Sequence, residues 1–209
     1  MSMVALIGTK GRMTQLYDDK GQVIPVTAVR VGKDCIVVRK RTVEADGYEA
    51  LQLGFGKPNA KRQNRPDAGV FKHAGLAPHK LLREVRFGDT SQFQKGQHLS
   101  VDLFKPGDKV AVIGTTKGRG FAGGVQRWNW SSGPRTHGSM SHRRTGSAGS
   151  GSSPGRVLRG RHQPGHYGVE RVTVKNLKIV KVEPERGVLY VSGAVPGNAG
   201  SLLVVRKLS

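Results

Sequence analysis

Three glycines have the spacing G-x-G-x-x-G at Gly118, Gly120 and Gly123, directly after the apolar run KVAVIGTT. Dinucleotide-binding folds and kinases use such glycines to bring backbone amides close to a phosphate. A dinucleotide fold also needs an acidic residue about 20 positions further on, but the next carboxylate is Glu170, and the chain contains neither the H-R-D nor the D-F-G motif of kinases. We therefore expect no nucleotide cofactor. The glycines are expected to serve sharp turns or a close approach of the backbone to a partner.

Other catalytic patterns in the same region also lack partners. The stretch GSSPG matches the G-x-S-x-G pattern of hydrolases around Ser153, but no histidine follows the first downstream acid, as that chemistry requires. His137 with His142, and His162 with His166, lie among arginines without a nearby carboxylate or thiolate, so a divalent cation would be repelled. We expect no catalytic residue and no metal. The histidines either stack on bases and donate to phosphate, or are solvated loop residues.

The charge of the chain is large and uneven. Lys and Arg total 35 against 14 acidic residues in 209, a net charge of +21, and a polyanion such as a nucleic acid is the expected partner of so basic a chain. Between Asp108 and Glu170 lie 61 residues without a carboxylate, and they hold 14 of the 30 glycines and both tryptophans. This segment has no apolar periodicity, so alone it should be largely disordered and should order on its partner.

The bases of this segment are mostly arginines, whose planar guanidinium suits phosphate contact and base stacking better than an ammonium does. They are the candidate RNA-binding residues Lys117, Arg119, Arg127, Arg135, Arg143, Arg144, Arg156, Arg159 and Arg161. The aromatic and histidine candidates are Trp128, Trp130, His137, His142 and His162. Trp128 and Trp130 would face the same way in an extended chain. They either anchor the base of the segment or stack on bases.

Outside this segment, short β-branched or alternating runs separated by turn residues predict strands. The runs cover residues 5–10, 14–19, 22–31, 34–42, 48–55, 98–104, 109–116, 170–195 and 201–208. A helical pattern and a further strand are expected within residues 72–87. The sole cysteine, Cys35, is expected to be a small buried hydrophobe in a reducing compartment. No apolar run approaches the length of a membrane span, and the opening MSMVALIG is too short for a secretory signal, so we expect a soluble intracellular protein.

A set of longer motifs is spread along the chain. The motif T-x-G-R-G-x-x-G-x-x-x-R runs from Thr116 to Arg127 and is followed by RWN, THG, SHRR and PGRV. Further stretches are IPVTAVRV, DGYEALQLGF, GVFKHAG, ERVTV, GAVPG and LLVV. In these motifs and in their order, the chain resembles the bacterial form of the large-subunit ribosomal protein three family. The resemblance covers nearly the whole chain.

This resemblance implies a mainly β fold, namely a six-stranded β-barrel of the translation-protein type with a small α+β insertion and a long, largely irregular basic extension. The barrel core would comprise residues 1–55, 90–116 and 168–209, the inserted subdomain residues 56–89, and the extension residues 117–167. The resemblance further implies a structural protein without catalytic activity or cofactor. It would bind large-subunit rRNA near its 3′ end early in assembly and extend the basic loop toward the peptidyl transferase centre.

The implied partners are rRNA and neighbouring large-subunit proteins, among them proteins fourteen and nineteen, with no membrane. The protein would be cytoplasmic and ribosome-bound, or belong to an organellar ribosome of bacterial type. Some members carry a methylated glutamine at the loop tip; Ser152 stands in that place here, so the modification is not expected. A DNA-compacting protein is the rival interpretation, but it would predict a helical reader or a repeated basic motif.

Overall fold

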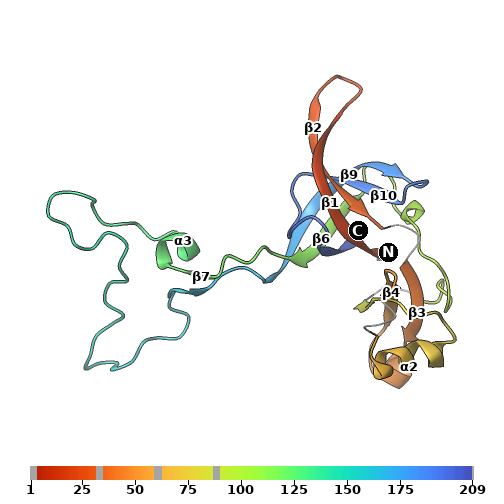
Figure 1. Cartoon of the computed structure of the whole chain (residues 1–209), viewed down its shortest axis with the longest axis horizontal. Helices are drawn as coiled ribbons and strands as arrows, with labels where there is room; N and C mark the ends of the chain where they lie inside the picture. The colour runs from red at the N-terminus through yellow and green to blue at the C-terminus, as the bar shows by residue number, and fades with distance from the viewer. Residues whose placement is uncertain (1–3, 32–34, 59–62, 87–89, 209) are drawn as a thin grey trace. The chain divides into compact units, whose positions relative to one another are not determined.

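The computed structural model describes residues 4–31, 35–58, 63–86 and 90–208. The chain forms two compact units (Figure 1). The first unit comprises residues 1–115 and 171–209, and the second comprises residues 116–170. Strands dominate the first unit, so the mainly β class expected from the sequence is confirmed.

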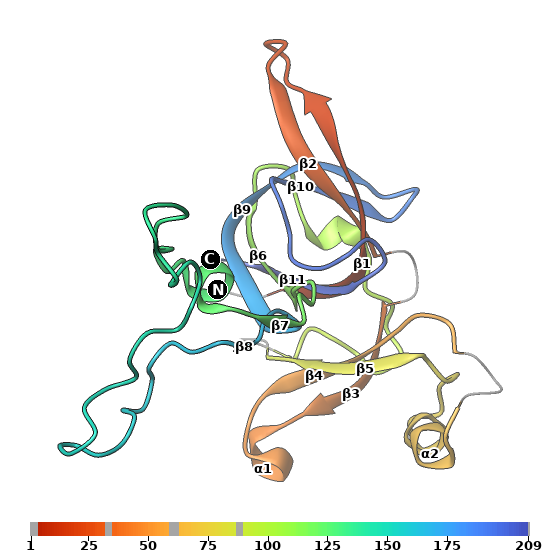
Figure 2. The ribbon, with the colours of Figure 1, turned by 60° about the vertical axis from the view of Figure 1, so that its left-hand side comes forward.

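Six antiparallel strands of the first unit close into a ring in which every strand pairs with two neighbours. In spatial order they are β1 (Ala5–Tyr17), β11 (Leu202–Lys207), β6 (Lys109–Thr115), β9 (Arg171–Glu183), β10 (Val188–Ser192) and β2 (Val23–Arg30). Because every strand has both neighbours, the ring leaves no strand edge free along its paired segments. The outer half of β1 pairs only with β2, and the two continue past the ring as a hairpin (Figures 1 and 2).

Alternation along the strands places one set of side chains inside the ring. In β11, Leu203 and Val205 are fully buried, whereas Leu202, Val204 and Arg206 are half-buried. The outward side of β11 therefore remains partly open to solvent.

A separate three-stranded sheet contains β3 (Cys35–Arg41), β4 (Ala50–Phe55) and β5 (Leu81–Val85), in the order β3-β4-β5. The short helix α1 (Val43–Asp46) connects its first two strands. The expected placement of residues 1–55 in one barrel is therefore wrong for β3 and β4. Each of them pairs within this sheet and with no strand of the ring among the described residues. β5 comes from the predicted inserted segment, so that segment supplies the third strand of the sheet.

Helix α2 (Arg65–Ala74) covers part of this sheet. Pro66 lies in its first turn, and Gly75 ends it in the left-handed conformation that glycine adopts without steric cost. Its buried Phe71 packs with Ile36 and Val38 of β3. The helix begins earlier than the pattern at residues 72–87 indicated. Residues 59–62 and 87–89 of the predicted insertion, and Asp34 of a predicted strand, lie outside the described residues.

Two strand predictions need correction. Residues 5–10 and 14–19 were expected as two runs, but β1 is continuous, with a register shift between Lys10 and Met13 that accommodates the interruption. Residues 98–104 form a short 3₁₀ helix, η2 (Val101–Leu103), preceded by a single bridge at His98. Leu99 and Phe104 are both buried, although an odd spacing would place them on opposite faces of a strand.

One apolar core joins the ring to the three-stranded sheet. Leu6 and Leu189 of the ring belong to the same buried cluster as Val37 and Leu53 of the sheet. Cys35 lies in this cluster, and its burial raises the pKa of the thiol to about 11 against a small opposing effect of a backbone hydrogen bond at Ile7. The expectation that Cys35 is a small buried hydrophobe is confirmed.

The second unit has little regular structure (Figures 1 and 2). Its elements are β7 (Phe121–Ala122), helix α3 (Gly124–Trp128) and β8 (Gly165–His166), with β7 and β8 paired. Residues 131–161 contain no helix or strand.

The buried side chains of the ring should dominate the stability of the first unit. We expect Leu189→Ala, which removes a fully buried side chain of β10, to lower the free energy of unfolding by about 2–5 kcal/mol. The control Val23→Ala truncates a side chain of β2 that is 55% exposed and should cost less than about 1 kcal/mol. Urea unfolding followed by circular dichroism measures both. Equal losses in the two variants would contradict this packing.

Candidate nucleic-acid interface

The second unit begins as two antiparallel arms joined by backbone hydrogen bonds. The amide of Thr116 donates to the carbonyl of Glu170 at 2.9 Å, and the amide of Arg119 donates to the carbonyl of Tyr167 at 2.8 Å. The amide of Tyr167 returns a bond to the carbonyl of Gly120 at 2.9 Å. Residues 116–130 and 162–170 therefore form a stem. In these arms part of the backbone is hydrogen-bonded across the stem.

Arginines line this stem beside aromatic rings. The guanidinium carbon of Arg119 lies 5.0 Å from the centre of the Tyr167 ring. Arg127 Nη1 donates to the carbonyl of Gln163 at 2.9 Å, and its guanidinium carbon lies 4.9 Å from the Trp128 ring. These contacts hold the two cations without neutralising them, because a ring and a carbonyl carry no net charge.

The tryptophans anchor the end of the stem. Trp128 Nε1 donates to the same carbonyl of Gln163 at 2.9 Å, and its ring stacks on His162 with the centroids 3.9 Å apart and the planes 2° from parallel. Trp130 is half-buried and packs against Gly124. Of the two interpretations of the tryptophans, this geometry favours anchoring. His162 covers one face of Trp128 and leaves a 36% exposed indole.

The three glycines of the G-x-G-x-x-G spacing have different local roles. A β-carbon on Gly118 would lie 2.9 Å from Val169 Cγ2, Gly120 has a φ of +65°, and Gly123 has open space around it. The tightest position is the following residue, Gly124, which the sequence interpretation missed: a β-carbon there would lie 2.0 Å from Trp130 Cε3. The close approach of the backbone shown here is thus to the chain's own tryptophan.

Local bonds also shape the loop beyond the stem. The amide of Gly133 donates to the carbonyl of His142 at 2.9 Å, and His142 Nδ1 lies 2.9 Å from the carbonyl oxygen of Pro134. Arg161 donates through both terminal nitrogens to the carbonyls of Ser147 and Ala148. Hydrogen bonds within the loop therefore close two short turns of chain, one before Arg143 and Arg144 and one after them.

Most of the predicted binding side chains face solvent. Arg127 and Trp130 are half-buried. The exposed ones are Lys117, Arg119, Trp128, Arg135, His137, His142, Arg143, Arg144, Arg156, Arg159, Arg161 and His162.

The charge of the second unit is uncompensated. It contains nine bases and one carboxylate, that of Glu170, a net charge of +8. Within the described residues, every ion pair joins side chains of the first unit, such as Lys207 with Asp108 at 2.7 Å. The bases of the second unit therefore have no ion-pair partner among the described residues, and such an excess of positive charge attracts anions.

The described part of the chain shows neither a metal centre nor a membrane span. No group of three His, Cys, Asp or Glu side chains gathers there in a way that would hold a metal ion. Among the described residues, no helix has the length and apolarity to cross a membrane.

Comparison with known proteins identifies the family. Residues 80–188 match the model of the family described as Ribosomal protein L3. The chain is 50% identical over 202 residues to the Large ribosomal subunit protein uL3 of Pelotomaculum thermopropionicum, covering 97% of this chain and 95% of the relative. The chain belongs to the ribosomal protein L3 family. The uL3 proteins of Heliobacterium modesticaldum and Thermotoga petrophila are 47% and 48% identical, covering 99% and 98% of this chain and 98% and 97% of the relatives.

Membership of the ribosomal protein L3 family confirms the resemblance found in the sequence. It also makes the chain a structural ribosomal protein and not an enzyme, in agreement with the incomplete nucleotide-binding and hydrolase patterns. The match spans β5 through the start of β10, and thus includes the whole second unit.

Gly124 offers a test of the anchor at the end of the stem. Gly124→Ala places a methyl group where the Trp130 ring lies, so we expect displacement of the indole, seen as an emission shift to longer wavelength and loss of near-ultraviolet dichroism. Gly123→Ala is the matched control, because Gly123 has a φ of −71° and no atom within 4 Å of an added β-carbon. Alanine is a better helix former than glycine, so helix propensity does not predict damage from Gly124→Ala. If this variant left tryptophan emission and near-ultraviolet dichroism unchanged, Trp130 would not pack against Gly124.

Proposed function

We propose that this protein is a structural constituent of the large ribosomal subunit that binds large-subunit rRNA through residues 116–170. The observation that carries the proposal is the net charge of +8 on a unit whose arginines are mostly exposed and form no ion pair among the described residues. The printed name of the relatives, Large ribosomal subunit protein uL3, supports the identity of the polyanion.

In the proposed mechanism, the second unit neutralises closely spaced phosphates. Each arginine that meets a phosphate displaces condensed counterions, which supplies an entropic part of the binding free energy. The stem is held by its own hydrogen bonds and keeps Arg119 and Arg127 beside rings. Residues 131–161 lack regular structure, and folded RNA fixes their final path.

The resemblance extends the proposal to finer points. The closed six-stranded ring corresponds to the translation-protein-type barrel, and the sheet β3-β4-β5 with α2, which includes the described residues of 56–89, to its inserted subdomain. The first unit contacts rRNA near its 3′ end during early assembly, and the loop extends toward the peptidyl transferase centre. Ribosomal proteins fourteen and nineteen are the proposed neighbours. The residues proposed to contact rRNA are those named from the sequence, with Trp128, Trp130 and His162 acting mainly through the stem.

Sedimentation separates this proposal from the DNA-compacting rival. An extract of the source cells, or of its organelles if the ribosome is organellar, is centrifuged in moderately high salt. The proposed function requires the protein to travel with large ribosomal subunits. Comigration with chromatin alone would contradict it.

Binding to large-subunit rRNA should depend steeply on salt. If about eight phosphates are engaged, the slope of log K against log salt is roughly −6 to −7. Replacing four exposed arginines by glutamine should make the slope shallower by about 3. Filter binding measures the slope for the variant Arg143→Gln, Arg144→Gln, Arg156→Gln and Arg159→Gln. A charge-matched control changes exposed bases of the first unit, namely Lys20→Gln, Lys72→Gln, Lys95→Gln and Arg186→Gln. Equal slopes in the two variants would argue against the second unit as the main contact.

Deleting Lys117–Tyr167 should leave the first unit folded while impairing subunit assembly. Thr115 and Arg171 are paired residues of neighbouring strands β6 and β9, so residues 116 and 168–170 remain as a short turn between them. Circular dichroism and urea unfolding report the fold, and incorporation into reconstituted subunits reports the function. An unfolded deletion variant would refute the division of roles between the units.

A further inference from the structure

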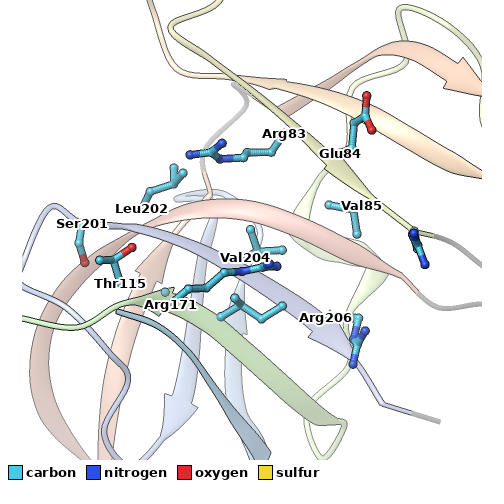
Figure 3. Close-up of a pocket in the computed structure, with 12 residues that line it drawn as sticks. Arg83, Glu84, Val85, Thr115, Arg171, Ser201, Leu202, Val204 and Arg206 are labelled. Carbon is cyan, nitrogen blue, oxygen red and sulfur yellow. The ribbon is translucent and has the colours of Figure 1, made fainter. Parts of the chain in front are cut away.

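A cavity of about 660 Å³ is lined by residues of the first unit. Its walls are the edge strand β5 and the outer side of the ring at β6, β9 and β11 (Figure 3). Strand alternation turns Leu202, Val204 and Arg206 of β11 to this side. The cavity therefore lies where the outer side of the ring meets the three-stranded sheet.

Four arginines line this cavity, three of them on strands; the fourth, Arg86, follows β5 and lies 5.6 Å from the centre of the Tyr48 ring. Arg83 extends from β5, and Arg171 and Arg206 extend from β9 and β11 on the facing wall (Figure 3). None of the three forms an ion pair or a side-chain hydrogen bond with another described residue. The three strand arginines thus share the cavity with a fourth, Arg86, and have no ion-pair partner among the described residues, which raises the free energy of the empty site.

The one carboxylate among the residues that line the cavity, that of Glu84, is paired with residues on the other side of β5. Glu84 points away from the cavity (Figure 3). Its Oε1 lies 3.0 Å from Arg41 Nη2, and its Oε2 accepts a 2.7 Å hydrogen bond from the Tyr48 hydroxyl. The Tyr48 hydrogen bond, followed by Arg41, lowers the pKa of Glu84 although partial burial opposes the shift. Glu84 is thus an ionised partner of Arg41.

Arg206 carries an unsatisfied donor. Its Nε is buried and has no hydrogen-bond partner within the described residues. A buried donor without an acceptor is costly, and native structures rarely keep one unless a water, ion or ligand supplies the acceptor. The other cavity groups near the ring are the hydroxyls of Ser201 and Thr115 and the apolar side chains of Leu202 and Val204. The two hydroxyl oxygens are able to accept a hydrogen bond, but neither is bonded to Arg206 Nε.

We propose that this cavity binds a phosphodiester group of the rRNA backbone through Arg83, Arg171 and Arg206. The inference rests on the proposed rRNA binding and adds a second contact, separate from residues 116–170. A phosphodiester carries one negative charge shared by two non-bridging oxygens, whose lone pairs accept hydrogen bonds from several guanidinium groups at once. The apolar wall of Leu202 and Val204 suits the adjoining sugar, and the volume exceeds that of an isolated anion.

The test compares full-length variants in binding to large-subunit rRNA. Arg83→Gln with Arg171→Gln removes two exposed cavity arginines. We expect a dissociation constant about tenfold higher and a salt slope shallower by about 0.7–0.9, the value for one phosphate. The control Lys20→Gln with Arg186→Gln removes the same charge from exposed positions outside the cavity and should change the constant less than about twofold. A cavity variant indistinguishable from this control would overturn the proposal.

A second measurement follows the cavity directly. In the full-length protein with ¹⁵N-labelled arginine, a uridine dinucleotide joined by one phosphodiester should shift the Arg206 Nε–H signal, and the shift should vanish in Arg83→Gln with Arg171→Gln. An unchanged Arg206 signal in the wild-type protein would overturn the inference. A cavity variant that keeps its affinity for rRNA but no longer binds neighbouring ribosomal proteins would also overturn it. If wild-type protein fails to bind rRNA while the Arg206 signal still shifts, the proposed function fails and the phosphodiester site stands.

Discussion

Uncompensated positive charge is the constraint on which the rest of this structure depends. Sixty-one consecutive residues contain no carboxylate, so the chain itself provides no partner for their bases. Repulsion among like charges opposes a compact arrangement, and the second unit accordingly has short paired arms and a loop without helix or strand. The acids of the chain gather in the first unit, where they make all the ion pairs found among the described residues. There a common core holds the ring and the sheet together.

The two proposed RNA contacts differ in how much of their geometry exists before binding. In the second unit, aromatic rings and carbonyls hold the arginines near the stem, while those further out are exposed on irregular chain. In the cavity of the first unit, Arg83, Arg171 and Arg206 project from strands. A site on strands loses less conformational entropy on binding than one on irregular chain. The proposed contact through residues 116–170 therefore adapts its conformation to the RNA. The proposed contact in the cavity accepts only a phosphate in one position relative to its arginines.

The sequence predicted the features that depend on local composition. The acid-free segment, the short strands and the family motifs were all visible in it, because charge, alternation and turn residues are local properties. The pairing of strands far apart in the chain was harder to predict from the sequence. The residue patterns in Cys35–Arg41 and Ala50–Phe55 indicate strands, but they do not show which sheet these strands join. Residues 98–104 looked like a strand by composition, yet burial of Leu99 and Phe104 in the common core favours a 3₁₀ turn.

Parts of the candidate site were hidden for the same reason. The role of Gly124 depends on where Trp130 folds back, and Arg83, Arg171 and Arg206 are far apart in the sequence. Two adjacent glycines, Gly123 and Gly124, were the only local sign that one of them serves packing. The Trp128–His162 stack likewise joins residues on opposite arms. Sequence spacing shows which groups are present, but it does not show which of them meet.

The pairing of β1 with β11 also determines when this protein can fold. The first strand of the ring hydrogen-bonds to the last, with Ala5 opposite Arg206. The ring thus cannot close during synthesis until β11 (Leu202–Lys207) has been translated. Until then the nascent chain exposes the unpaired side of β1 together with a fully translated cationic loop. A polyanion can therefore engage the loop of a newly made chain before its folding is complete.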